Sequence, residues 1–305
     1  MSTPVVLIVF NRPDTTQQVL EAIQQVQPRK LFVIADGPRQ EVSADAEKCA
    51  ATRKLLEAVE WDCELLTNFA DTNMGLKRRV STGLDWVFTQ VDEATILEDD
   101  TVPHPSFFRF CQELLEQYRH DRRVTSITGT NLLGEWKSDM QSYHFSNYFN
   151  SWGWATWKRV WDNYDVDMRL WAEPEARSRV RDVIADDRQY GNRKRLLEAT
   201  YQGKTKSWAY QFFFMSLLNS GLTITPAVNL VANVGFGQQA TNTRSLAASQ
   251  RRLSAQAMPF PLKAPIGLAV DRDHDYQRYK QVWERTLSKR IRWKLRALNQ
   301  RLRGK

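Results

Sequence analysis

Three consecutive acidic residues, Glu98, Asp99 and Asp100, end an apolar run in the stretch ILEDDTVPHP. Like charges this close raise one another's pKa unless a cation lies between them. Successive strand residues point to opposite faces, so the three carboxylates cannot all chelate one ion directly. Hard carboxylate oxygens suit Mg²⁺ or Mn²⁺, which keep waters and bridge to phosphates. The triplet therefore indicates a divalent-cation site, with a solvated acidic loop before the next helix as the alternative.

The elements that must position this triplet are short apolar runs that alternate with helical patterns over about the first 130 residues. The apolar runs are VVLIVF, KLFVIADG, CELLTNF, EATILEDD and RVTSITGTN. This order predicts a doubly wound, mostly parallel α/β sheet flanked by helices. Ligands of such sheets bind beyond the carboxyl ends of the strands. Polar residues at those ends are Asn11, Arg12, Asp36, the stretch 71–75 and the acidic triplet.

The second half of the chain has a different pattern. Residues 131–170 are aromatic-rich and are expected to be irregular, residues 175–202 are charged and helical, and SWAYQFFFMSLLNSG is an apolar helix followed by a β-rich segment. We expect one domain over 1–243, an irregular connection over 244–275 and a basic amphipathic helical tail over 276–305.

Charge is concentrated in that tail. The 305-residue chain has a net charge of +8, but residues 276–305 hold eleven Lys and Arg against one acid, which leaves the body close to neutral. A basic amphipathic helix with Trp favours an anionic membrane surface, and a helix docked on the body is the alternative. Nucleic-acid binding is not expected, because no nucleic-acid module is recognisable.

The first residues show no signal-peptide pattern, and no apolar run reaches the length of a membrane span. The expected location is therefore cytoplasmic, and peripheral at the inner face of the membrane if the tail binds lipid. Cys49, Cys63 and Cys111 are expected to be free thiols, because their number is odd and their spacing is wide.

In their order and spacing, several segments resemble the GT-A class of nucleotide-sugar glycosyltransferases, close to the family 2-like bacterial enzymes. They are VVLIVFNRPDTTQQVL, LFVIADGPR, NMGLKRRVSTGLDWVF, ILEDDTVP, SWGWATWKRVW and SWAYQFFFMSLLNSGLTITPAVNLVANVGFG. The triplet is also similar to the EDD metal motif of the N-acetylglucosaminyltransferase I type. Neither GxGxxG after the first strand nor GxxxxGK[ST] occurs, so a dinucleotide fingerprint and a P-loop are excluded.

The resemblance implies roles for the residues of these motifs. Asp36 would read the nucleotide base, and Asn11 and Arg12 would lie beside the nucleotide. Asp100 would be the metal ligand, with Glu98 and Asp99 near the ribose, the donor sugar or the metal's waters. Asn73, Gly75 and Lys77 match the stretch near the base and diphosphate, and Gly37 and Gly75 are equally explained as turn residues.

The acceptor side of the site is harder to predict. An inverting transfer needs a carboxylate base, but the slot in KSWAYQFFF holds Trp208 and no acid. Asp165 is the preferred base and Asp99 its rival. Trp152 and Trp154 flank Gly153 and are expected, with Trp208, to contact an acceptor glycan, because Trp rings stack on sugar faces. Trp157 and Trp161 are spaced as core residues of a helix.

Together these features predict a Mn²⁺- or Mg²⁺-dependent glycosyltransferase of the hexosyltransferase class. By resemblance it would move a sugar from a nucleotide sugar such as a UDP-sugar to a glycan or lipid-linked acceptor, inverting, in bacterial surface polysaccharide synthesis. A sugar nucleotidyltransferase is the first alternative, although FNRPDTT lacks the glycines expected of its phosphate loop. A non-catalytic sugar-binding protein is the second.

Overall fold

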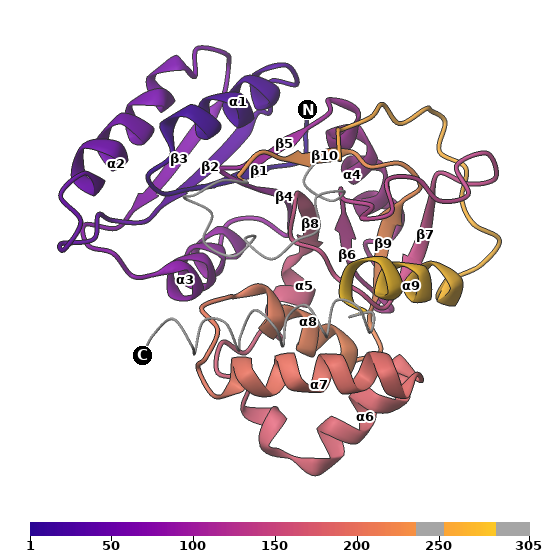
Figure 1. Cartoon of the computed structure of the whole chain (residues 1–305). Coiled ribbons are helices and arrows are strands. Elements are labelled where there is room, and N and C mark those ends of the chain that lie inside the picture. The colour runs from indigo at the N-terminus through magenta and orange to yellow at the C-terminus, as the bar shows by residue number, and fades with distance from the viewer. Residues whose placement is uncertain (236–252, 285–305) are drawn as a thin grey trace, which may run out of the picture.

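The computed structural model describes residues 1–235 and 253–284 of the chain (Figure 1). Its strands are β1 (Val5–Val9), β2 (Lys30–Ala35), β3 (Glu64–Phe69), β4 (Glu93–Glu98), β5 (Thr101–Pro103), β6 (Val124–Thr128), β7 (Tyr143–Ser146), β8 (Trp154–Trp157), β9 (Leu222–Pro226) and β10 (Val231–Asn233). Eight of them form one sheet in the order β3-β2-β1-β4-β8-β6-β9-β7, and β10 pairs with β5 in a small ribbon.

The sheet is mostly parallel, as the sequence predicts. β1 pairs in parallel with β2 and β4, β2 with β3, and β6 with β9. β8 runs antiparallel between β4 and β6, and β7 runs antiparallel to β9. Both antiparallel strands lie in the aromatic-rich stretch that we expected to be irregular. They are four residues long, too short for an alternating pattern to reveal them.

The register of the parallel strands aligns their carboxyl ends. Val5 of β1 lies opposite Leu31 of β2 and Thr95 of β4, and Ile8 lies opposite Glu98. The loops that follow β1, β2 and β4 therefore leave the sheet at one edge, where the polar residues of the sequence motifs meet.

Helices cover both faces of the sheet. They are α1 (Pro13–Gln24), α2 (Asp45–Lys54), η1 (Leu55–Ala58), α3 (Leu76–Phe88), α4 (Ser106–Gln117), α5 (Lys158–Trp161), η2 (Arg169–Ala172), α6 (Pro174–Ile184), α7 (Asp187–Tyr201), α8 (Ala209–Leu218), α9 (Arg272–Arg278) and the π-helical turn η4 (Tyr279–Trp283). In Figure 1, α1 and α2 lie on one side of the β1–β3 half and α3 on the other, while α6, α7 and α8 form a helical layer below the sheet.

Large aromatic side chains join this helical layer to the sheet. Trp154 of β8 and Trp208 at the start of α8 are buried and stacked, with ring centroids 5.2 Å apart. Trp157 and Trp161 are also buried, which confirms their predicted place in the core. Burial of rings this large contributes heavily to the hydrophobic stabilisation of the fold.

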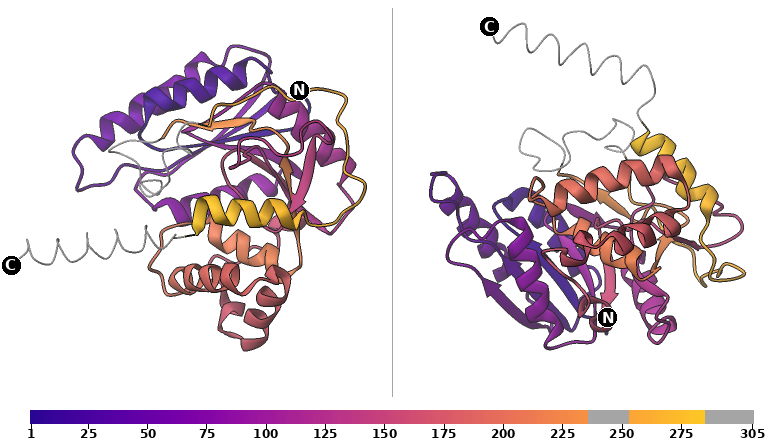
Figure 2. Two further views of the ribbon diagram at one scale, coloured as in Figure 1. Left: turned by 45° about the vertical axis from the view of Figure 1, so that its right-hand side comes forward. Right: turned by 90° about the horizontal axis from the view of Figure 1, so that it is seen from below.

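The chain returns to the sheet after residue 253. Residues 253–270 are irregular, and α9, which begins within the range 244–275 expected to be irregular, packs beside β7 (Figure 2), where Asp271 N donates to Phe145 O over 2.8 Å. The predicted tail beyond Glu284 lies outside the described residues. Within 1–235 and 253–284, no helix has the length and apolar character needed to cross a bilayer.

Candidate functional site

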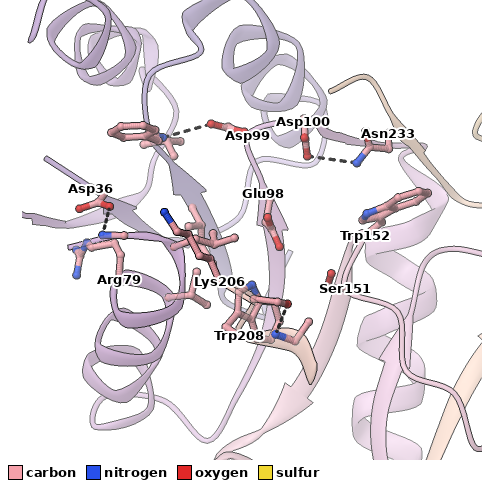
Figure 3. A pocket seen from close by; sticks show the side chains of 18 of the residues that line it. Asp36, Arg79, Glu98, Asp99, Asp100, Ser151, Trp152, Lys206, Trp208 and Asn233 are labelled. Carbon is pink, nitrogen blue, oxygen red and sulfur yellow. Dashed lines mark hydrogen bonds between the residues drawn. The ribbon is translucent and has the colours of Figure 1, made fainter. Parts of the chain in front are cut away.

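A cavity of about 820 Å³ opens at the carboxyl ends of β1, β2 and β4 (Figure 3). The predicted site residues that line it are Asn11, Arg12, Asp36, Asn73, Gly75, Glu98, Asp99, Asp100, Trp152 and Trp208. Lys77, Trp154 and Asp165, also predicted for the site, do not line it. The structure thus brings together the predicted nucleotide-side residues other than Lys77. Of the two predicted bases, Asp99 lines the cavity and Asp165 does not.

The acidic triplet, Glu98, Asp99 and Asp100, turns out of β4 into the cavity. Arg12, from the loop after β1, joins its members: its Nη1 atom lies 3.4 Å from Asp99 Oδ1 and 2.8 Å from Asp100 Oδ2. The Phe10 backbone N–H donates to Asp99 Oδ2 over 3.3 Å, and Asn233 Nδ2 lies 3.4 Å from Asp100 Oδ1. Two carboxylates therefore converge on one positively charged atom.

Burial and mutual repulsion raise the pKa values of the triplet. Burial, with the nearby Asp100 and Asp99 charges, raises the pKa of Glu98 to about 8, against a hydrogen bond from Trp208 and the charge of Arg12. Burial also raises the pKa of Asp99 and of Asp100, and Arg12 opposes both shifts. Among the described residues, one guanidinium faces three acids with raised pKa values, so this part of the cavity favours additional positive charge.

The donor set suits a hard divalent cation. Asp99 and Asp100 already converge on the Arg12 guanidinium, and carboxylate oxygens are the protein ligands that Mg²⁺ and Mn²⁺ prefer. No group of three or more His, Cys, Asp or Glu side chains within 1–235 and 253–284 is arranged to hold a metal. A cation held by these two carboxylates would take its other ligands from phosphate oxygens and water, as Mg²⁺ commonly does.

Asp36, immediately after β2, stabilises the loop that contains residues 73–75 by hydrogen bonds. Its carboxylate accepts hydrogen bonds from the backbone N–H groups of Gly37, Met74 and Gly75 over 2.9, 2.8 and 3.0 Å, and from Asn73 Nδ2 over 3.0 Å. Four donors occupy both oxygens, so the residue organises the loop that borders the cavity. Whether it also reads a base, as the resemblance implies, stays a prediction.

Both glycines of this region have a backbone reason to be glycine. A Cβ on Gly37 would lie 2.5 Å from the carbonyl carbon of Thr72, and Gly75 has a φ of +78°. The turn interpretation of Gly37 and Gly75 thus has a direct structural basis.

A second polar network lies at the rim, where Asn11 meets α2. Asn11 Nδ2 donates to Asp45 Oδ1 over 2.7 Å, and Arg39 binds the same carboxylate with its Nε and Nη2 atoms over 2.5 and 2.9 Å. The hydrogen bonds from Arg39, and then those from Asn11, hold the pKa of Asp45 down to about 2. The network fixes the loop after β1 against α2.

The tryptophans that were predicted to contact an acceptor lie in different environments. Trp152 lines the cavity, Trp208 reaches it with its side chain largely in the core, and Trp154 is fully buried against Trp208. Asp165 caps a turn instead, accepting from Arg169 N over 2.8 Å. Lys77 Nζ donates to Val166 O over 3.4 Å.

Among the cationic residues of the cavity wall that were not predicted for the site are Arg193, Lys206 and Arg278. They come from α7, from the loop before α8 and from the end of α9. Each lies in a segment already rich in charge, so neither spacing nor composition distinguishes it from a solvated surface residue.

No family model matches the chain, and no curated protein matches it. Solved structures with a similar fold include UDP-glucose pyrophosphorylase complexed with UDP-glucose (9% identity, 53% of this chain and 78% of that chain, TM-score 0.31) and apo UDP-glucose pyrophosphorylase (8% identity, 76% and 93%, TM-score 0.40). Another is a putative glucose-1-phosphate thymidylyltransferase from Bacillus anthracis (8% identity, 53% and 74%, TM-score 0.34).

These structures correct one expectation. A glycosyltransferase of the hexosyltransferase class was expected, whereas these similar structures are described as pyrophosphorylases and a thymidylyltransferase, and none of them as a glycosyltransferase. The expected similarity to the N-acetylglucosaminyltransferase I type has no support among them either. What the chain shares with them is a GT-A-like α/β fold, the fold class that the sequence predicted.

Proposed function

We propose that the cavity binds a nucleotide sugar and that the chain is a sugar nucleotidyltransferase. In the forward direction, an oxygen of a sugar phosphate attacks the α-phosphorus of a nucleoside triphosphate. The bond from the α-phosphorus to the bridging oxygen breaks, and pyrophosphate leaves with that oxygen. The products are a nucleotide sugar and pyrophosphate.

The observation that carries this proposal is that one cavity holds carboxylates converging on a cation and, separately, cationic side chains on other elements. Asp99 and Asp100 share Arg12, while Arg193 and Lys206 line the same space. A nucleotidyltransferase binds two substrates that each carry phosphate, so it needs two places for phosphate in one cavity. The phosphates of the nucleotide would lie near a divalent cation held by the carboxylates, and the phosphate of the sugar near guanidinium or ammonium groups.

The state of the acids also favours a phosphate nucleophile over a hydroxyl one. Asp36 is occupied by four donors, Asp45 by Arg39, and Asp99 and Asp100 by Arg12. The pKa of Glu98 near 8 keeps that carboxyl protonated at neutral pH. A hydroxyl nucleophile would need one of these carboxylates to leave its present partners and act as a base, whereas a sugar phosphate is already an anion and needs no base.

In this scheme the residues bind and orient. Asn11, Asn73 and the loop fastened by Asp36 border the nucleotide, and Arg12 lies between the triplet and the phosphates. A divalent cation, held by Asp99 and Asp100 when bound, would neutralise phosphate charge as a Lewis acid. The protein's main contribution is then to hold the two phosphate groups close and in line.

The test is a pyrophosphate-release assay. Nucleoside triphosphates are paired with sugar 1-phosphates in Mg²⁺ or Mn²⁺, and the reverse reaction is followed with pyrophosphate and nucleotide sugars. We expect turnover with one pair. Asp100→Asn should weaken metal-dependent nucleotide affinity by roughly tenfold or more, because one of two converging carboxylates is lost.

Asp62→Asn, at an exposed position outside the cavity, is the matched control. Stabilisation by a nucleotide sugar without turnover would favour the non-catalytic binding protein instead. Neither turnover nor a thermal shift with any nucleotide would remove the proposal altogether.

A further inference from the structure

A second charged group in the cavity wall is made of two buried arginines. We call it the arginine cluster: Arg193 and Arg278, with the rings of Tyr148, Phe213 and Trp283 around them. All five residues line the same cavity as the acidic triplet. They come from α7, the end of α9, the segment after β7, α8 and η4, so distant parts of the chain converge here.

Arg193 is almost wholly buried, and no carboxylate of the described residues forms an ion pair with it. Its residue exposure is 3%, and its Nε atom has no hydrogen-bond partner in the described part of the chain. Besides a hydrogen bond with the Tyr148 side chain, the guanidinium contacts aromatic rings, with the central carbon 4.2 Å from the ring centroid of Trp283, 4.9 Å from Tyr148 and 5.7 Å from Phe213.

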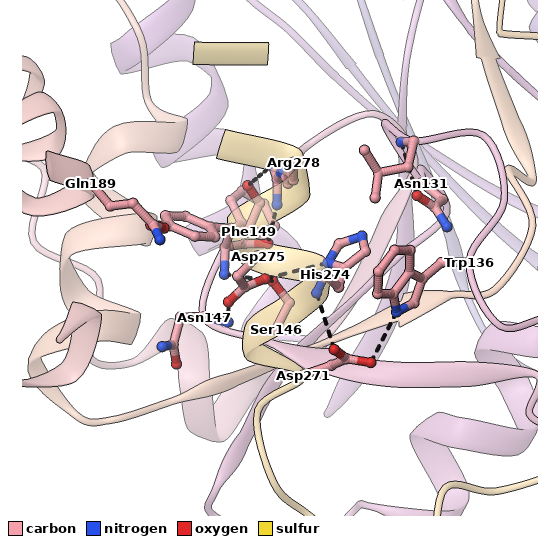
Figure 4. Close-up of polar contacts among 12 residues, drawn as sticks. Asn131, Trp136, Ser146, Asn147, Phe149, Gln189, Asp271, His274, Asp275 and Arg278 are labelled. Carbon is pink, nitrogen blue, oxygen red and sulfur yellow. Dashed lines mark hydrogen bonds and ion pairs between the residues drawn. The ribbon is translucent and has the colours of Figure 1, made fainter. Parts of the chain in front are cut away.

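Arg278 flanks the same Tyr148 ring, with its guanidinium carbon 5.4 Å from the centroid. Its Nη1 donates to Tyr148 O over 2.9 Å and its Nη2 to Phe149 O over 3.3 Å (Figure 4), while its Nε lacks a partner among the described residues. The backbone contacts fix the position of this guanidinium without neutralising its charge.

The nearest acid is committed to other groups. Asp275 accepts from Ser146 Oγ and from the Asn147 backbone N–H, and its Oδ1 lies 3.3 Å from His274 Nδ1. Burial and then the charge of Arg193 lower the pKa of Arg278 to about 10, against the attraction of Asp275. Two cations share one acid, so the described residues leave positive charge in excess.

Aromatic contacts offset the cost of such a burial without neutralising the charge. Desolvation of an ion costs several kcal/mol, whereas a cation–π contact returns about 0.5 to 2 kcal/mol. A bound anion would supply the missing compensation. The planar fork of an arginine matches the oxygens of phosphate, and aromatic walls shield that interaction from water.

We propose that the arginine cluster is a phosphate-binding site, with Arg193 as the main ligand and Arg278 as its supporting charge. The identity of the ligand as a sugar phosphate rests on the proposed function. The phosphate of the sugar phosphate would lie here, while the nucleotide's phosphates lie by the acidic triplet. The site then selects a phosphorylated sugar over a neutral one.

The test compares variants of the full chain by calorimetric titration with glucose 1-phosphate, inorganic phosphate and neutral glucose. Arg193→Met keeps an apolar chain between the three rings. Arg195→Met removes the same charge from an exposed position of the same helix that does not line the cavity, and is the matched control. Arg193→Lys keeps the charge without the fork.

We expect wild type and Arg195→Met to bind both phosphates, and Arg193→Met to bind them roughly tenfold or more weakly, because a charge-assisted fork is lost. Arg193→Lys should lie between them. Arg193→Met should unfold at a denaturant concentration close to that of wild type, since an unneutralised buried charge is replaced by an apolar group. If it does not fold, Arg193→Lys against Arg195→Met decides the result.

Equal phosphate affinity in wild type and the Arg193 variants, or no phosphate binding by wild type, would overturn this inference. Loss of phosphate binding in Arg193→Met, together with no pyrophosphate release from any substrate pair, would keep the phosphate site and reject the nucleotidyltransferase. The two proposals therefore fail separately.

Discussion

The acidic triplet and the arginine cluster line one cavity and carry excess charge of opposite sign. In the triplet, two of three consecutive acids, Asp99 and Asp100, bind one guanidinium of the described residues, that of Arg12. The arginine cluster holds two guanidiniums whose nearest described acid, Asp275, is bound to other groups, and its members are separated by many residues. Each part is therefore left with charge that a ligand of the opposite sign would neutralise.

The two parts differ in what stabilises their excess charge when no ligand is bound. Carboxylates can take up protons, and the pKa of Glu98 near 8 shows that tendency. A guanidinium keeps its proton at neutral pH, so the arginine cluster instead uses aromatic faces, which stabilise a cation and do nothing for an anion. Loss of Arg12 should therefore destabilise the folded protein more than loss of any single neighbour of Arg193.

The largest expected effect is from Arg12→Gln, which removes the cation between Asp99 and Asp100. Leaving buried carboxylates without their partner should lower the free energy of unfolding by about 3 kcal/mol. Millimolar Mg²⁺ alone should restore part of this loss, because an ion that binds only the folded state stabilises it. Urea denaturation with EDTA or with Mg²⁺ measures both effects.

Arg122→Gln, at an exposed position, controls for the loss of one positive charge and should change stability little. If Arg12→Gln were as stable as this control, the triplet would not depend on its guanidinium, and the contrast with the arginine cluster would disappear.

A smaller effect is expected from Asp36→Asn. The amide keeps one acceptor oxygen, but its NH₂ group would face N–H donors of the loop that contains Met74 and Gly75. We expect a loss of about 2 kcal/mol in the free energy of unfolding, from unsatisfied buried donors. Hydrogen exchange of the Met74 and Gly75 amides should accelerate, with Asp62→Asn as the control. Unchanged protection of those amides would show that the loop does not rely on Asp36.

The smallest effect concerns Asp45 at the rim. Its folded-state pKa of about 2 is lower than the ordinary aspartate value of about 3.9, so the ionised carboxylate contributes stability above pH 4. This contribution is lost as the pH falls from about 4 through about 2. Because Arg39 is partly exposed, we expect Asp45→Asn to cost only about 1 kcal/mol at pH 7.

Denaturation of wild type and Asp45→Asn between pH 2 and pH 7 measures this difference. The two stability curves should converge toward pH 2. A gap that persists at pH 2 would mean that Asp45 acts through packing rather than through its charge.

The sequence predicted the sheet and the triplet for the same reason: their residues are contiguous. Strand runs such as VVLIVF alternate with helices, and Glu98, Asp99 and Asp100 directly follow one of them. Local spacing therefore placed them at the edge where ligands bind. The antiparallel insertion of β8 was missed, because four residues carry too little periodicity.

The arginine cluster was missed for a different reason. Arg193 is one of several basic residues in α7, and only the packing of α8, α9 and η4 around it excludes water. Trp154 was placed with the acceptor because glycan-binding and core tryptophans look alike in sequence, and the structure buries it against Trp208. Long-range packing, not local pattern, decides both cases.

Arg278 donates hydrogen bonds to the backbone carbonyls of Tyr148 and Phe149, so these contacts form only after Arg278 itself has been synthesised. On the ribosome, a nascent chain that has released only residues 1–235 already contains every strand of the main sheet and the whole acidic triplet. It still lacks α9 and η4, and with them Arg278 and Trp283. The arginine cluster is therefore completed after the acidic triplet, so the nascent protein acquires its two charged groups one after the other rather than together.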